Sequence, residues 1–162
     1  MLIVIDCEKS FSAVDQITEW VVKEIVRAKK RDEWIMLVTT DSRTVTRIAK
    51  HVRGYGKVLK VRKYYDDGSP IIFERLFAHY WRRSRRLSDK HVGDIRSVRV
   101  VGLNTSACVM KTVAGLRRFV RVTVVSRACA NSEGMHGAIL SLEQHHRGAL
   151  RRMKTWKNVR VV

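Results

Sequence analysis

The stretch VVGLNTSACVMKTVAGLRR, residues 100–118, shows how this 162-residue chain is built. Its apolar start predicts a strand over 97–103, and the apolar spacing that follows predicts a helix over 106–118. Small polar residues join the two elements and lead to Cys108, at the predicted start of the helix. A strand followed closely by a helix is the repeating unit of parallel α/β sheets.

The same alternation of short apolar runs and longer amphipathic runs extends along the whole chain. The predicted strands cover residues 2–6, 34–40, 57–61, 97–103, 120–126 and 158–162. The predicted helices cover residues 13–30, 43–53, 70–86, 106–118 and 133–150. Because parallel strands need helical crossovers, we predict an α/β fold, a three-layer α/β/α sandwich with a mainly parallel, Rossmann-like sheet of about six strands. With no repeat or linker in the sequence, residues 1–162 are expected to form a single domain.

The composition is strongly basic. There are 33 Lys and Arg residues against 15 Asp and Glu, a net charge of +18. Such an excess attracts polyanions, but it does not identify a function. Three widely spaced cysteines do not form a disulfide framework, which favours a reducing, cytoplasmic setting. No apolar stretch approaches the roughly 20 residues that span a membrane, so no membrane partner is expected.

Acidic, basic and thiol side chains follow several of the predicted strands. Parallel sheets bind ligands at the carboxyl ends of their strands, near the point where the strand order reverses. Asp6 ends the first strand, Asp41 follows the second, Lys63 follows the third and Cys108 follows the fourth. An acid, an amine and a thiol are therefore expected at one edge of the sheet.

Three motifs resemble those of a known superfamily. IVIDCEKSF (3–11) resembles the opening motif, VVGLNTSACV (100–109) the cysteine turn, and VTVVSRACANSEGMHGAILSL (122–142) the closing segment of the isochorismatase-like cysteine hydrolases. That superfamily includes nicotinamidases and N-carbamoyl amidohydrolases. The resemblance implies a homo-oligomeric hydrolase that cleaves a small amide, carbamoyl or related compound through a covalent thioester. The surrounding basic charge favours an anionic substrate.

The resemblance also implies a catalytic triad of Asp6, Lys63 and Cys108. Asp6 would accept the thiol proton, and Lys63 would support the negative charge and orient Asp6. Lys60 is the alternative lysine, although it lies inside the predicted strand. We expect the helix N-terminus and the lysine to favour the thiolate, which is the nucleophilic form.

The remaining site residues follow from the same resemblance. It implies a cis peptide at Leu103–Asn104 and an oxyanion hole formed by the backbone N–H groups of Asn104 and Cys108. The candidate residues of a substrate pocket are Phe11, Tyr64 and Tyr65.

No metal or other cofactor is expected. Nicotinamidases carry an Asp-x-His element after the second strand, where further histidines help to bind a metal. Here Asp41 is kept, but Arg43 occupies the position of the histidine, and the other histidines lack metal-ligand spacing.

Other interpretations remain open at this point. Cys108 alone is also typical of a buried structural cysteine, and a basic chain offers many incidental lysines in place of Lys63. Residues 80–91 and 145–157 interleave aromatic and basic side chains, which suits either a solvated surface or phosphate binding. The alternative function is therefore a catalytically silent fold whose basic surface binds nucleic acid or another polyanion, although nucleic acid is not the favoured partner.

Overall fold

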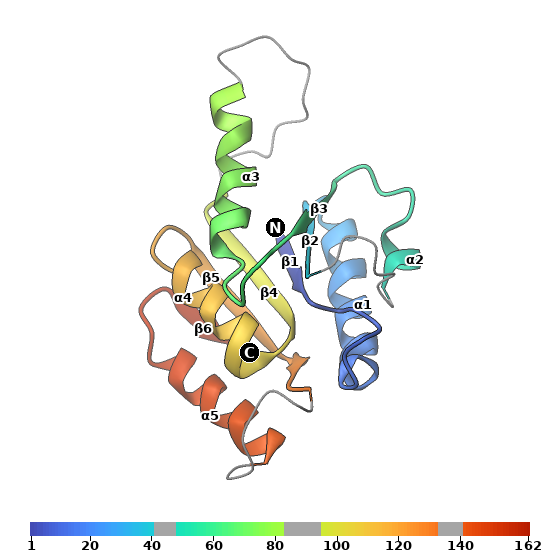
Figure 1. The fold of residues 1–162 in the computed structure, drawn as a ribbon. Helices are drawn as coiled ribbons and strands as arrows, with labels where there is room; N and C mark the ends of the chain where they lie inside the picture. Colours follow the sequence, from blue (N-terminus) through green and yellow to red (C-terminus); the bar gives the residue numbers. More distant parts are fainter. Residues whose placement is uncertain (41–47, 83–94, 133–140) are drawn as a thin grey trace.

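The computed structural model describes residues 1–40, 48–82, 95–132 and 141–162 (Figure 1). The strands are β1 (Leu2–Ile5), β2 (Ile35–Thr39), β3 (Val58–Arg62), β4 (Ser97–Leu103), β5 (Arg121–Ala130) and β6 (Val159–Val161). The helices are α1 (Val14–Lys30), α2 (Ala49–Val52), α3 (Ser69–Arg82), α4 (Met110–Leu116) and α5 (Leu142–Lys154), with a π-helical turn, η1 (Thr105–Val109), before α4. None of the described helices combines the length and the apolar character needed to cross a membrane.

The six strands form one sheet in the order β3-β2-β1-β4-β5-β6, and every neighbouring pair is parallel. The chain builds outward from β1 to β3, then crosses back so that β4 lies on the other side of β1. The strand order therefore reverses between β1 and β4. This is the position at which parallel sheets bind ligands.

Side chains of β1 alternate between two apolar cores, one on each face of the sheet. Leu2 and Val4 pack with residues of α1 and α2, whereas Ile3 and Ile5 pack with residues of α3, α4 and α5. All four are buried, as expected for a strand with helices on both sides. The predicted α/β/α sandwich with a parallel sheet is confirmed.

The predicted helix over 106–118 is instead two elements, η1 and α4. The backbone around Cys108 forms a π-helical turn, so the cysteine lies before α4 and not within its first turn. Apolar spacing alone does not distinguish a π-turn from an α-helix over so few residues.

The bounds of two other elements also differ from the prediction. β5 continues to Ala130 rather than ending near 126, with a register shift against β4 between Val100 and Gly102. α5 begins at Leu142, because Ser141 and Gln144 form a capping box there, and it ends at Lys154. Residues 41–47, 83–94 and 133–140, which include parts of three predicted helices, lie outside the described residues.

Candidate active site

Asp6 is the first residue beyond β1 and is completely buried. Its backbone φ of 50° lies in the left-handed region, where aspartate is among the few non-glycine residues found. Its N–H donates to the Val38 carbonyl at 2.9 Å, which fixes the turn against β2. The carboxylate is thereby held at the point where the strand order reverses.

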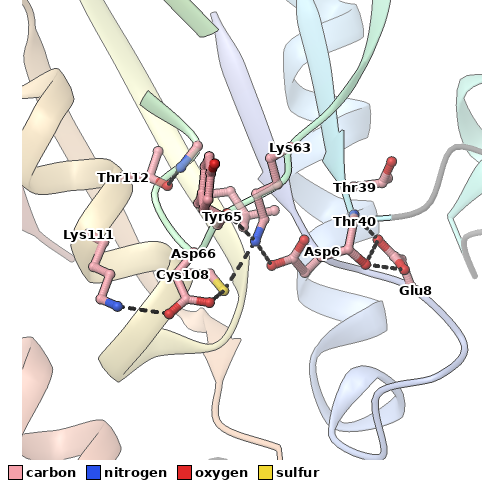
Figure 2. A network of polar contacts seen from close by, with 12 residues as sticks. Asp6, Glu8, Thr39, Thr40, Lys63, Tyr65, Asp66, Cys108, Lys111 and Thr112 are labelled. Carbon is pink, nitrogen blue, oxygen red and sulfur yellow. Dashed lines mark hydrogen bonds and ion pairs between the residues drawn. The ribbon is translucent and has the colours of Figure 1, made fainter. Parts of the chain in front are cut away.

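Lys63 lies directly after β3, and its side chain is 2% exposed. Its Nζ is 2.9 Å from Asp6 Oδ2 and donates hydrogen bonds to Cys108 Sγ at 3.3 Å and to the Tyr65 carbonyl at 3.2 Å. Figure 2 shows this ammonium between the carboxylate and the thiol. The alternative, Lys60, lies within β3 and is exposed, so Lys63 is the lysine that contacts both partners.

Cys108 lies in η1 and is 4% exposed. The turn begins at Asn104, whose carbonyl accepts hydrogen bonds from the N–H groups of Ala107 and Val109 at 3.1 and 3.0 Å. The peptide bond between Leu103 and Asn104 is cis, as predicted. The three residues of the predicted triad therefore meet at one edge of the sheet, from the ends of β1 and β3 and the turn after β4.

Neighbouring segments hold the cysteine turn from outside. The Ser132 N–H donates to Asn104 Oδ1 at 2.6 Å, and the Ser106 N–H donates to Asn131 Oδ1 at 3.1 Å. These contacts come from the end of β5. The turn is thus fixed by polar contacts that do not involve Lys63 or Asp6.

The environment of Cys108 disfavours its thiolate form. Burial, together with the negative charge of Asp6, raises the pKa of the Cys108 thiol to about 11, and the opposing effect of Lys63 is smaller. Lys63 acts in the expected direction and favours the thiolate, but burial and Asp6 outweigh it, so the net pKa is raised and not lowered. Desolvation opposes any buried charge, and Asp6 is a like charge for a thiolate.

Asp6 and Lys63 respond to the same burial in different ways. Burial raises the pKa of Asp6 above its ordinary value, although Lys63 partly offsets this effect. Burial acts to lower the pKa of Lys63, but attraction to Asp6 and Cys108 outweighs it, and the net pKa is raised. Lys63 therefore keeps its charge, and Asp6 is a better proton acceptor than an exposed aspartate.

Three charged residues near this cluster were not singled out in the sequence. Asp66 Oδ1 accepts a hydrogen bond from Cys108 Sγ at 3.8 Å, and Asp66 Oδ2 lies 2.8 Å from Lys111 Nζ (Figure 2). The hydrogen bond from Lys111 lowers the pKa of Asp66. Glu8 is buried beyond Asp6, where its carboxylate accepts hydrogen bonds from the Thr40 N–H and hydroxyl.

A sequence signal existed for one of these three. Lys111 follows Cys108 by three residues, a spacing that places two helical residues on the same face. Asp66 belongs to the segment DDGSP (66–70), whose composition indicates a turn and gives no sign of a contact with Cys108.

The predicted pocket residues lie in different environments. Tyr64 and Tyr65 are 75% and 81% exposed, so they lie at the surface beside Lys63. Phe11 is half-buried and packs against the core on the α1 side of the sheet. Their role in binding substrate stays a prediction.

Asp41 and Arg43 lie outside the described residues. Among the residues that the structure does describe, no three His, Cys, Asp or Glu side chains gather in a way that could hold a metal ion.

No family model matches the sequence, and no curated protein matches it either. Solved structures do match. The nicotinamidase from Staphylococcus aureus superposes with a TM-score of 0.69 at 19% identity, covering 99% of this chain and 97% of that chain. An isochorismatase from Pseudomonas putida matches with a TM-score of 0.68 at 15% identity, covering 99% and 86% of the two chains. The MAR1 ribonuclease from Caenorhabditis elegans matches with a TM-score of 0.69 at 15% identity, covering 99% and 74%.

These similarities concern the fold. The chain shares the fold of this nicotinamidase and this isochorismatase over nearly its whole length, and the fold that the motifs imply is confirmed.

Proposed function

We propose that this protein is a cysteine hydrolase that cleaves a small amide, carbamoyl or related compound. The main support is the position of Lys63 Nζ, 2.9 Å from Asp6 Oδ2 and 3.3 Å from Cys108 Sγ. A nucleophile beside a base, with a third group that orients the base, is the arrangement that covalent catalysis requires.

In the first half of the proposed reaction, Asp6 takes the thiol proton as the sulfur attacks the carbonyl carbon. Asp6 Oδ1 is buried and has no hydrogen-bond partner among the described residues, so this oxygen is free to accept a proton. The C–N bond of the tetrahedral intermediate then breaks, and the leaving amine takes the proton from Asp6. The product of this half is a thioester on Cys108 and a free amine.

In the second half, water attacks the thioester carbon and gives its proton to Asp6. The C–S bond breaks, the carboxylic acid leaves, and the proton returns to the sulfur. Lys63 remains charged throughout and stabilises whichever partner carries the negative charge. These steps use only water and residues of this chain.

The backbone N–H groups of Asn104 and Cys108 are the proposed donors to the oxyanion of the intermediate. Removing one such donor typically costs about 3–4 kcal/mol in the barrier. The contacts from Ser132 and Asn131 support this role, because they keep the turn in place before substrate arrives.

The proposed substrate is small, and an anionic group on it would suit the net charge of +18. Tyr64 and Tyr65 offer exposed aromatic rings beside Lys63. A homo-oligomer is expected by resemblance and stays a prediction.

Ammonia release from a panel of primary amides and N-carbamoyl compounds tests the activity. We expect one class to be hydrolysed by the wild type and by Cys129→Ala, a matched control because Cys129 is also buried but does not contact Lys63. Cys108→Ala is expected to lose the activity.

A generic acyl donor extends the test to the case in which the panel lacks the substrate. p-Nitrophenyl acetate is expected to acetylate Cys108, as measured by intact and peptide mass spectrometry with Cys7 and Cys129 replaced by alanine. Hydrolysis that survives Cys108→Ala would contradict the proposal. Absence of both hydrolysis and acetylation would favour the catalytically silent fold.

A further inference from the structure

The net charge of this protein is unevenly distributed along the chain, because the acidic residues are sparse in its last third. Residues 110–162 contain eleven of the 33 Lys and Arg residues but only two of the 15 acidic residues, Glu133 and Glu143. In the fold this segment supplies α4, β5, α5 and β6, which lie together on one side of the molecule (Figure 1). The excess charge is therefore concentrated at the β5–β6 end of the sheet.

A groove of about 420 Å³ lies at this end, between α5 and the paired strands β5 and β6. Its lining includes Ser126, Gln144, Arg147, Leu150, Arg151 and Lys154. Arg147, Arg151 and Lys154 are spaced by four and three residues on α5, so they form one row along the groove. All three are exposed, while Ala149 and Met153 anchor the helix in the core.

The carboxylate and carbonyl oxygens beside the groove already have hydrogen-bond or ion-pair partners. Glu143 pairs with Arg147, and the Val162 main-chain oxygen accepts hydrogen bonds from the amide and the hydroxyl of Ser126. Arg151 and Lys154 have no acidic partner within the described parts of the chain. Arg151 and Lys154 are thus available to an external anion, and Arg147 can exchange its exposed ion pair with Glu143 for a phosphate, since exposed ion pairs contribute little free energy.

The length of the row argues for a chain of phosphates over a single one. Seven residues of α-helix span roughly 10 Å at a rise of about 1.5 Å per residue, which exceeds the size of one phosphate group. The described lining contains no aromatic side chain on which a base could stack. Contacts of this kind hold a nucleic acid by its backbone and carry no sequence information.

We propose that the groove between α5 and the β5–β6 edge binds the phosphate backbone of a nucleic acid independently of base sequence. The groove shares no lining residue with the Asp6–Lys63–Cys108 cluster. The inference therefore does not rest on the proposed hydrolase activity. It also differs from a general effect of the +18 charge, because it assigns the binding to three particular side chains.

Fluorescence anisotropy with fluorescein-labelled single-stranded RNA tests the proposal. The wild type is expected to bind two unrelated sequences equally well. The groove variant, Arg147→Gln/Arg151→Gln/Lys154→Gln, is expected to bind at least about tenfold more weakly at about 0.15 M salt. A plot of log association constant against log salt concentration should also be less steep, by about 2 in slope.

The matched control is Lys23→Gln/Lys30→Gln/Arg53→Gln, which removes the same charge from exposed positions on α1 and beside α2. It is expected to change the affinity by less than about threefold, because these side chains do not line the groove. Thermal unfolding confirms that both variants fold.

Two outcomes would overturn the proposal. Equal losses in the groove variant and the control would show that only net charge matters. Negligible binding of the wild type at about 0.15 M salt would show that the cations of α5 form a solvated surface or stabilise the carboxyl end of the helix.

Discussion

Asp6, Lys63 and Cys108 share a space that solvent barely reaches, so their charges must balance among themselves. One carboxylate and one ammonium, 2.9 Å apart, cancel each other. A thiolate beside them would add an uncompensated negative charge, which a buried site strongly disfavours. This balance explains why the pKa of the thiol is raised to about 11. In this account substrate does not meet a preformed thiolate, and sulfur is activated as its proton moves to Asp6.

The raised pKa of Asp6 predicts the acid limb of the pH profile. Asp6 must be ionised to accept the thiol proton, so acylation of Cys108 should fall as the pH drops through the pKa of Asp6. Because burial raises this pKa, the midpoint should lie above the ordinary value of 3.8. The rate of Cys108 acetylation by p-nitrophenyl acetate, measured against pH, checks this. A midpoint at or below 3.8 in protein that remains folded would contradict the assignment of Asp6 as the base.

The sequence predicted which residue types meet at this site, but not their ionisation. Asp6, Lys63 and Cys108 follow the carboxyl ends of β1, β3 and β4, an arrangement that apolar periodicity predicts for a parallel sheet. The pKa of Cys108 depends on burial and on Asp6, a residue remote in sequence. Asp66 was missed for a related reason, since its contact with Cys108 comes from a loop folding back over the turn.

Gly102 in β4 lets the strand pass the end of β1. Its φ is +125°, and a Cβ there would lie 1.9 Å from the Ile5 carbonyl oxygen. That carbonyl belongs to backbone next to Asp6, so it has little freedom to move. Glycine at this position allows the close approach of β1 and β4, the two strands between which the strand order reverses.

We predict that Gly102→Ala lowers the free energy of unfolding by about 3 kcal/mol or more, through backbone strain and the clash with Ile5. Gly148→Ala is the matched control, because no atom lies within 4 Å of its added Cβ and the residue is inside α5. It should be neutral or stabilise by up to about 1 kcal/mol. Urea denaturation monitored by circular dichroism measures both. Similar stabilities for the two variants would contradict the role given to Gly102.

At the scale of elements, periodicity predicted the strands and the long helices but not the local turns. The face of α1 formed by Val14, Ile17, Val21, Ile25 and Ala28 is buried, as its spacing indicates. The π-turn around Cys108 and the extension of β5 depend on hydrogen bonds with neighbouring segments. Such contacts leave little trace in a local pattern.

At the scale of the whole molecule, the net charge of +18 opposes the compact state through repulsion between surface cations. Added salt screens this repulsion. We therefore predict that the melting temperature rises between low and moderate concentrations of sodium chloride, as measured by differential scanning calorimetry. The triple variant of the groove and the matched control Lys23→Gln/Lys30→Gln/Arg53→Gln should both show a smaller rise in melting temperature, because each removes three positive charges. A melting temperature that falls with salt would show that attractive ion pairs dominate instead.

Composition gave the amount of charge, but the arrangement of that charge depended on the fold. The row of Arg147, Arg151 and Lys154 could be read from helical spacing, whereas the groove beside it exists only because β6 pairs with β5.

The pH dependence of Cys108 alkylation by iodoacetamide, with Cys7 and Cys129 replaced, tests the central claim most directly. The wild type should label slowly at neutral pH and faster toward pH 11, in line with its raised pKa. Iodoacetamide alkylation reports the fraction of thiolate and not proton transfer to Asp6. Asp6→Asn should therefore label faster than the wild type at neutral pH, because the negative charge that raises the pKa of Cys108 is removed. Lys63→Met should label more slowly, because the charge that opposes this effect is lost. A faster labelling rate in Asp6→Asn and a slower one in Lys63→Met would establish that both side chains control the ionisation of Cys108. Identical profiles of labelling rate against pH in all three proteins would contradict the account.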